Sequence, residues 1–278
     1  MEVASFRKKE LISNYVILGI FAIVSLAPIL VLIFNAFKPA VEFGTNPIGL
    51  PNNITFQNFP DAWIQGEYSK IFFNSFKLVL GTLILCISVS SLAGFSLAKL
   101  NPKGSNLVAI YLLVGISIPA QMFLLPLFLL WKNLGLLNTH IGLIIIYSAL
   151  NAPFATFLIR SYMIRLPDEL FDAAKIDGAN ILQQFFRVAI PLSWPVLLTS
   201  ALVVGLAVWN EFLFALTFVQ DEELKPISTI LFAFSWRFIN NQALVSAASI
   251  MMVAPVVILF LLFQKRFISG LTSGGVKG

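Results

Sequence analysis

Long apolar stretches dominate the pattern of hydrophobic and polar positions along the chain. Five of them contain no Asp, Glu, Lys or Arg and a sixth is interrupted only by Glu211; they cover residues 11–37, 78–98, 104–131, 133–159, 188–220 and 238–264. A helix needs about 20 apolar residues to cross the hydrocarbon core of a membrane. The stretches are continuously apolar rather than alternating, which favours helices over barrel strands. The pattern therefore predicts an all-α integral membrane protein with six transmembrane helices.

The positive charges indicate how these helices are oriented. If the N-terminus lies inside, most of the 18 Lys and Arg residues fall on the inner loops, and short cytoplasmic loops do collect positive charge. We therefore expect both termini in the cytoplasm and one transmembrane domain over residues 1–278. Its parts outside the membrane are a cytoplasmic N-terminus (1–10), an outer loop (38–70), a cytoplasmic loop between spans four and five (161–195) and a cytoplasmic tail (265–278).

Composition agrees with a membrane protein and limits the chemistry. The chain is 58% hydrophobic and 11% charged, whereas a soluble domain carries about 25% charged residues. Basic inner loops that face anionic lipid account for the net charge of +5, so no nucleic-acid partner is needed. The single Cys86 excludes an internal disulfide, and the single His140 cannot make a metal site alone. Pro119 and Pro126 predict a kink in the third helix.

The loop between spans four and five has the residues of a helix-turn-helix elbow. In "RLPDELFDAAKIDGAN", Pro167 suits the first turn of a helix, and the acids that follow it favour the positive end of the helix dipole. The pair Asp177-Gly178 predicts a turn, because Gly178 can adopt a left-handed backbone. A second helix over 181–189 should lead through Pro191 and Pro195 into span five. From these residues alone, the elbow is either a docking surface or an amphipathic hairpin that rests on lipid.

The same loop resembles the EAA loop of permease subunits from ABC importers. That motif has Glu-Ala-Ala, a Gly three residues later and a downstream Leu-Pro; this chain has Asp172-Ala173-Ala174, Asp177-Gly178-Ala179 and Ile190-Pro191. Asp in place of Glu keeps the charge and shortens its reach. "AVWNEFLFALTF" and the ending "KRFISGLTSGGVKG" are similar to segments of permeases from carbohydrate importers. The similarity is to the maltose-type second permease in particular. The resemblance extends over residues 72–278.

The resemblance implies a set of partners and contact residues. Two permeases would form the pathway, a dimer of ABC ATPase subunits would lie beneath it, and an extracytoplasmic solute-binding protein would deliver a di- or oligosaccharide, all at a bacterial or archaeal plasma membrane. Coupling to the ATPase would use Asp168, Glu169, Phe171, Asp172, Ala173, Ala174, Asp177, Gly178 and Ala179, and the tail would contact it through Ser269, Gly270 and Lys277. The chain has no Gly-x-x-x-x-Gly-Lys-Ser/Thr phosphate loop, so we expect that it is not an enzyme and that it binds no cofactor. ATP and Mg²⁺ would be used by the partner ATPase.

Trp209, Asn210 and Glu211 are the candidate pathway or gating residues. Glu211 is the only acid inside an expected span, where a charge must face protein or water. Glu211 either binds sugar hydroxyls or bonds to Asn210 or a neighbouring span. Trp209 either stacks on a sugar ring or packs against other side chains. An importer of glycerol phosphate, an amino acid or a peptide remains an alternative. An autonomous secondary transporter would need more ionisable residues along its path, and an intramembrane protease would need nucleophile or metal motifs that the chain lacks.

Overall fold

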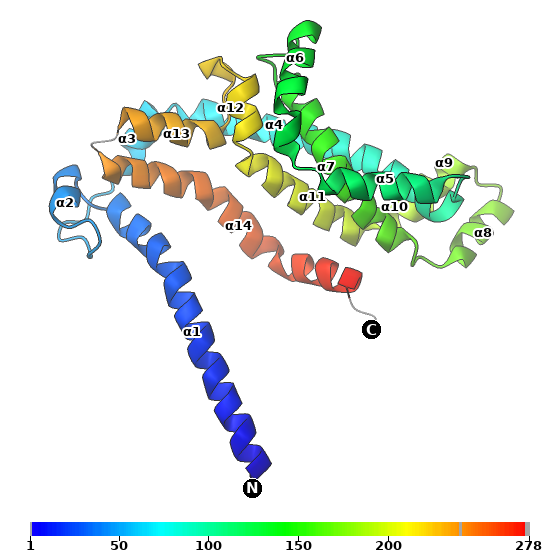
Figure 1. Cartoon of the computed structure of the whole chain (residues 1–278), viewed down its shortest axis with the longest axis horizontal. Coiled ribbons are helices and arrows are strands. Elements are labelled where there is room, and N and C mark those ends of the chain that lie inside the picture. The colour runs from blue at the N-terminus through cyan, green and yellow to red at the C-terminus, as the bar shows by residue number, and fades with distance from the viewer. Residues whose placement is uncertain (1, 239–240, 276–278) are drawn as a thin grey trace. The chain divides into compact units, whose positions relative to one another are not determined.

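The structure is a computed structural model that describes residues 2–238 and 241–275. All regular elements within those residues are helices, as the apolar stretches predict (Figure 1). The residues form two compact units. One takes in the residues up to Tyr68 together with Leu231–Pro255, and the other takes in Ser69–Ile230 together with the residues from Val256 on.

The first unit contains the N-terminal helix and the short helices of the expected outer loop. Its elements are α1 (Glu2–Ala36), α2 (Ala40–Thr45) and α3 (Asn58–Gln65), with most of α13 (Ile227–Arg237) and the first part of α14 (Gln242–Gly275). The buried Tyr68 hydroxyl donates a hydrogen bond to the carbonyl of Ala248, 2.9 Å away, and so joins the end of the outer loop to α14 within this unit.

The second unit is built around α7, which packs against α5 and α11. Its elements are α4 (Tyr68–Phe95, of which Tyr68 belongs to the first unit), η1 (Ser96–Leu100), α5 (Ser105–Ser117), η2 (Ala120–Phe123), α6 (Leu124–Leu134), α7 (His140–Met163), α8 (Asp168–Ile176), α9 (Ile181–Gln184), η3 (Phe185–Ala189), α10 (Ile190–Leu192), α11 (Trp194–Asn210), α12 (Leu213–Phe218) and η4 (Glu222–Leu224). Leu143 and Ile146 of α7 are fully buried in its core beside Val204 and Val208 of α11.

Within residues 2–238 and 241–275, four helices are long and apolar enough to cross a membrane alone. They cover Asn14–Ala36, Tyr68–Leu100, His140–Met163 and Gln242–Gln264. Two further pairs qualify together but bend sharply: Ser105–Ser117 with Ala120–Leu134 by 91°, and Ile181–Leu192 with Trp194–Asn210 by 76°. The chain is therefore an all-helical membrane protein with four to six candidate spans, and six if each bent pair crosses once.

The predicted kink in the third apolar stretch is found at Pro119. The backbone of Ile118 is extended (φ −82°, ψ 125°) between α5 and η2, because the ring of a following proline disfavours the helical conformation. Pro126 produces no kink of its own. It lies in the first turn of α6, where the missing N–H would have no partner within the helix.

The expected outer loop is ordered around a buried lysine. The fully buried Lys38 ammonium donates hydrogen bonds to Asn35 Oδ1 (2.8 Å) and to the Asn46 carbonyl (2.6 Å). Asn58 Nδ2 donates to the carbonyls of Ala36 and Lys38, both at 2.8 Å. These contacts repay part of the cost of removing a charge from water. The loop contains turns, which its Pro, Gly and Asn residues favour over a long helix, and also the two short helices α2 and α3.

Candidate functional site

The first helix of the elbow, α8 (Asp168–Ile176), begins and ends where the sequence predicts. Pro167 (φ −59°) precedes α8, and two acids follow it in the first turn, where the free N–H groups of the helix favour negative charge. Gly178 ends the helix with φ +82°. Its N–H donates to the carbonyl of Lys175 (3.0 Å) and the N–H of Ala179 donates to that of Ala174 (2.9 Å). This pair of bonds is the Schellman motif, which satisfies the last carbonyls of a helix.

The second arm of the elbow is capped by Asn180. Its side chain accepts from the N–H of Gln183 (2.9 Å), and the Gln183 side chain accepts from the N–H of Asn180 (2.8 Å). This capping box fixes where α9 starts. The arm then continues to Leu192, three residues past the expected end at Ala189, because the widened turn η3 accommodates Pro191 inside the helical run. The 76° bend follows at Ser193 rather than at Pro191.

Phe171 attaches α8 to the rest of the second unit. Its side chain is buried, 6.1 Å from the ring of Phe95 at the end of α4. Phe95 in turn contacts Phe185 of η3 at 5.4 Å. The residues of this apolar cluster are Phe95, Ile159, Met163, Phe171, Phe185, Ala189 and Leu197. Phe171 therefore faces its own chain, and any part it has in coupling is to hold α8 in place.

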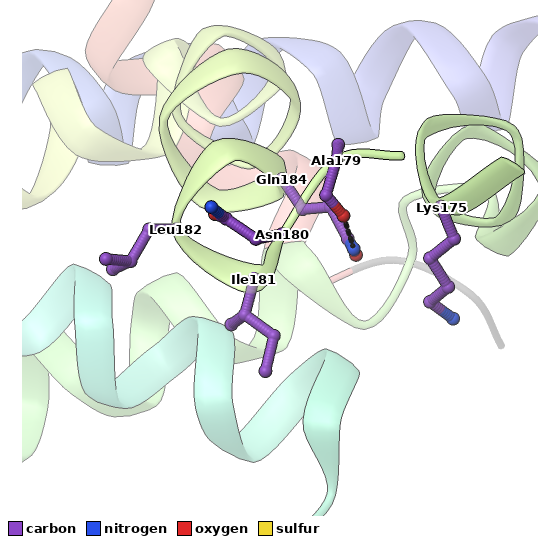
Figure 2. A pocket seen from close by; sticks show the side chains of 6 residues that line it. All are labelled: Lys175, Ala179, Asn180, Ile181, Leu182 and Gln184. Carbon is purple, nitrogen blue, oxygen red and sulfur yellow. Dashed lines mark hydrogen bonds between the residues drawn. The ribbon is translucent and has the colours of Figure 1, made fainter. Parts of the chain in front are cut away.

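The other expected coupling residues form the opposite side of the elbow. Asp168, Glu169, Asp172, Ala173, Asp177 and Gly178 are exposed, while Ala174 and Ala179 are half-buried. Two large apolar side chains lie among them, since Leu170 is 44% exposed and Ile176 is 86% exposed. An open groove of about 550 Å³ adjoins this surface, lined by Lys175 of α8 and by residues 179–182 and 184 (Figure 2). The elbow thus presents small and apolar side chains together with four acids that can meet another protein.

Sequence reasoning missed Lys99, which is bonded to the start of the elbow. Its ammonium donates to the carbonyl of Leu166 and to Asp168 Oδ1, both at 2.6 Å. Lys99 precedes Asp168 by 69 residues, so no local pattern could have paired them. The one signal in the sequence was a lysine two residues before Asn101-Pro102, a pair that favours the end of a helix.

Glu211 lies at a break between two helices rather than inside a span. α11 ends at Asn210 and the backbone of Glu211 is extended (φ −70°, ψ 120°). Its carboxylate accepts from the Tyr147 hydroxyl of α7 (2.8 Å) and from the N–H groups of Phe214 (2.9 Å) and Ala215 (3.1 Å). Glu211 therefore caps α12 and joins it to α7. A bond to a neighbouring helix was one of the roles that the sequence left open for Glu211.

The other two candidate pathway residues have partners on their own unit. Trp209 is half-buried, with its ring 5.8 Å from that of Phe72 on α4. Asn210 is exposed and its Nδ2 donates to the carbonyl of Leu206, one turn earlier in α11 (2.8 Å). Both contacts serve packing, and Asn210 bonds within its own helix.

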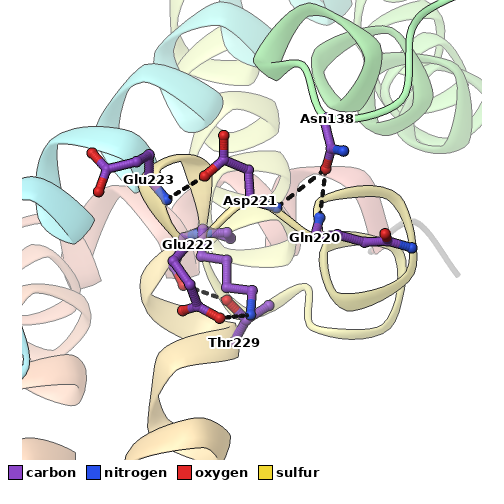
Figure 3. A network of polar contacts seen from close by, with 8 residues as sticks. Asn138, Gln220, Asp221, Glu222, Glu223 and Thr229 are labelled. Atoms are coloured by element: carbon purple, nitrogen blue, oxygen red, sulfur yellow. Dashed lines mark hydrogen bonds and ion pairs between the residues drawn. The ribbon is translucent and has the colours of Figure 1, made fainter.

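The segment that follows α12 is held by the turn between α6 and α7. Asn138, which has a left-handed backbone (φ 55°), accepts through Oδ1 from the N–H groups of Gln220 (2.6 Å) and Asp221 (3.2 Å), as Figure 3 shows. Its own N–H donates to the carbonyl of Phe218 (2.9 Å). The Asp221 carboxylate then accepts from the N–H of Glu223 (2.9 Å). We call residues 138 and 218–223 the Asn138 clasp.

Three residues are expected to form the tail contact. Lys277 lies outside the described residues, and Ser269 and Gly270 are described only as part of the α14 backbone. In the part of the chain that the structure describes, no three His, Cys, Asp or Glu side chains form a group that can hold a metal ion.

An all-helical membrane fold with an elbow of this kind defines a class of transport subunit, and comparison with known proteins identifies the family. Residues 87–273 match the family described as "Binding-protein-dependent transport system inner membrane component". The chain belongs to this family. It is a multi-pass inner membrane permease subunit of a binding-protein-dependent ABC importer, a transport subunit rather than an enzyme.

Individual relatives are similar over nearly their whole length. The probable ABC transporter permease protein YurM of Bacillus subtilis is 35% identical over 96% of this chain and 88% of its own. The arabinooligosaccharides transport system permease protein AraQ of Halalkalibacterium halodurans is 37% identical over 92% of this chain and 93% of its own. A chain of a bacterial ABC transporter that imports the acidic polysaccharide alginate has a TM-score of 0.82 at 26% identity, over 94% of this chain and 97% of its own.

Proposed function

We propose that this chain forms half of the membrane pathway of an ATP-driven importer for a di- or oligosaccharide. The relatives support the substrate class, since one is named for arabinooligosaccharides and another belongs to an alginate importer. The other half of the pathway is a second permease, and an extracytoplasmic binding protein delivers the sugar. Import of glycerol phosphate, an amino acid or a peptide is the alternative.

The chain crosses the membrane six times in this proposal, with both termini in the cytoplasm. Each bent pair then crosses the membrane once, the second through Trp194–Asn210, and the elbow lies on the cytoplasmic side, where the excess of Lys and Arg predicts it. The outer loop 38–70 faces the binding protein. ATP and Mg²⁺ are used by a dimer of ATPase subunits beneath the elbow, because this chain carries no phosphate loop.

The observation that carries the proposal is the geometry of the elbow. Phe171 is buried and fixes α8 to its own chain, while Ala173, Ile176 and Asp177 are exposed on the side away from it. A helix that rested on lipid would direct its largest apolar side chains to the membrane and its charges to water. Here exposed Ile176 and Asp177 are neighbours at the tip, which suits a protein groove better than a lipid surface. The tail, through Ser269, Gly270 and Lys277, adds a second contact with the ATPase.

The proposal is tested by purification and transport. The chain is tagged, solubilised from its native membrane in mild detergent, and every co-purifying protein is identified by mass spectrometry. We expect a second permease and an ABC ATPase. The complex is then reconstituted in liposomes with its binding protein, and uptake of labelled oligosaccharides is measured with and without ATP. The matched control is the same complex with the phosphate-loop lysine of the ATPase replaced.

Each outcome of that experiment has a definite meaning. Uptake that needs ATP and an intact ATPase supports the importer. Uptake by this chain alone without ATP would mean an autonomous transporter, and the elbow would then have no coupling role. If labelled peptides or amino acids are taken up and oligosaccharides are not, the substrate class is wrong although the importer is right.

A further inference from the structure

A buried lysine in the turn that follows α4 is bonded to the start of the coupling elbow. Lys99 lies in the widened turn η1, and its side chain is 6% exposed. Its ammonium contacts the Leu166 carbonyl and the Asp168 carboxylate at 2.6 Å, and it lies 5.1 Å from the centre of the Phe171 ring. All three partners belong to the entry and first turn of α8.

Such a lysine differs from an ordinary inner-loop charge. Removing an ammonium from water is costly unless hydrogen bonds and opposite charge replace the water. Lys103, four residues later in the same loop, is exposed and only adds to the positive charge of that side. Among the described contacts, only residues of the elbow bond to the buried Lys99 ammonium. The position of the elbow therefore depends on Lys99.

The two side chains of this ion pair differ in exposure, which suits a role in positioning the elbow rather than in stabilising the fold. The Asp168 side chain is 82% exposed, whereas that of Lys99 is buried. The hydrogen bond and the positive charge of Lys99 lower the pKa of the Asp168 carboxyl below its ordinary value. Asp168 is therefore ionised at neutral pH, and the contact persists under the conditions in which the transporter works.

The contacts of α8 with η1 and with the end of α4 lie at its N-terminal end, and α8 also contacts α9 and η3 of the same elbow. Lys99 holds its N-terminus and Phe171 anchors its first turn, while Ile176, Asp177 and Gly178 are exposed at the far end. A force applied to the far end of a rigid helix turns it about its attached end. The attached end must therefore be fixed to a span if the movement is to reach the pathway.

We propose that Lys99 is a positioning residue that fastens the coupling helix α8 to α4, so that movement of the ATPase reaches the membrane pathway. The inference rests on the proposed function, because it assumes that α8 contacts the ATPase. Lys99 touches neither sugar nor ATP and acts through Asp168, Leu166 and Phe171.

The test measures the sugar transported per ATP hydrolysed in the whole reconstituted complex. Lys99→Met keeps the length and apolar stem of the side chain but removes the ammonium. We expect this ratio to fall on the order of tenfold, the factor produced by losing one hydrogen bond to a charged group. Lys103→Met, which removes an exposed charge from the same loop, should leave the ratio unchanged.

Two further variants separate positioning from a general structural role. Asp168→Asn alters only an exposed side chain and should lower the ratio in the same direction. In the double variant Lys99→Met/Asp168→Asn the loss should be no larger than in Lys99→Met alone, because both changes break one link. If Lys99→Met does not assemble, Asp168→Asn is compared with Glu169→Gln, which changes another exposed acid of the same turn, and only a loss confined to Asp168→Asn supports the inference. A normal ratio in Asp168→Asn would then overturn the inference.

A cross-link distinguishes failure of this inference from failure of the proposed function. In a Cys86→Ala background, Ile176→Cys is cross-linked to the ATPase with a bifunctional maleimide, with and without Lys99→Met. If no cross-link forms in either case, α8 does not meet the ATPase and the proposed coupling site is wrong. If the cross-link forms and Lys99→Met keeps the normal ratio, only the role of Lys99 is overturned.

Discussion

Gly178 ends α8 with a left-handed backbone, and the space around it allows two causes of damage to be separated. A Cβ atom built at Gly178 meets nothing within 4 Å among the described residues. Valine there would be strained by about 1–2 kcal/mol because of the positive φ, whereas asparagine tolerates this conformation. We expect Gly178→Val to abolish coupling of ATP hydrolysis to sugar uptake and Gly178→Asn to retain it, measured on the purified complex.

The same pair of variants reports whether the ATPase covers Gly178. If both substitutions reduce the amount of ATPase that co-purifies, the empty space seen in this chain is filled by the partner. Coupled transport in Gly178→Val, with the complex intact, would contradict a docking role for the turn.

Glu211 is expected to act as a structural link rather than as a sugar ligand. Its carboxylate accepts three hydrogen bonds, and bonds to a charged group contribute about 1.5–3 kcal/mol each. Glu211→Gln removes the charge and leaves one acceptor oxygen, so the melting temperature of the complex should fall while the KM for sugar is kept. Tyr147→Phe should lower the melting temperature as well, and the double variant should lose less than the sum. A raised KM at unchanged melting temperature would place Glu211 in the sugar path.

At the scale of elements, the Asn138 clasp connects the α6–α7 turn to the segment after α12. Asn138→Gly keeps the left-handed backbone and removes only the side-chain bonds, while Asn138→Ala also adds strain of about 1–2 kcal/mol. We expect the melting temperature of the complex to decrease in the order wild type, Asn138→Gly, Asn138→Ala. Equal stability of the two variants would mean that the side-chain bonds, not the backbone, fix this turn.

The elements predicted best from the sequence are those whose signals are local. The start of α8 at Pro167, its end at Gly178 and the break at Pro119 all follow from the backbone restrictions of single residues. The contacts that give these elements a function are long-range. Lys99 meets Asp168 and Tyr147 meets Glu211 across 69 and 64 residues, and hydropathy carries no information about such pairs. The break at Glu211 was missed for the same reason, since an apolar run continues on both sides of it.

For the molecule as a whole, the coupling model depends on an even number of crossings before the elbow. The α5–α6 pair bends by 91° and is either one broken span or a re-entrant loop. If it crosses once, α7 returns the chain to the cytoplasm and the elbow lies where ATP is available. If it is re-entrant and the other spans cross, α7 carries the elbow to the outside, where no ATPase can reach it.

Labelling of single cysteines in intact cells decides between these arrangements. In a Cys86→Ala background, a membrane-impermeant maleimide should label Asn53→Cys and Lys132→Cys and should not label Lys103→Cys or Lys175→Cys until the membrane is opened. All four native side chains are exposed in the structure, so burial within this chain does not explain a negative result. A re-entrant α5–α6 reverses two of the four results, because Lys132 would then be protected and Lys175 labelled. That reversal would remove the physical basis for coupling through α8, whatever the identity of the sugar, since a cytoplasmic ATPase cannot contact a surface on the outer side of the membrane.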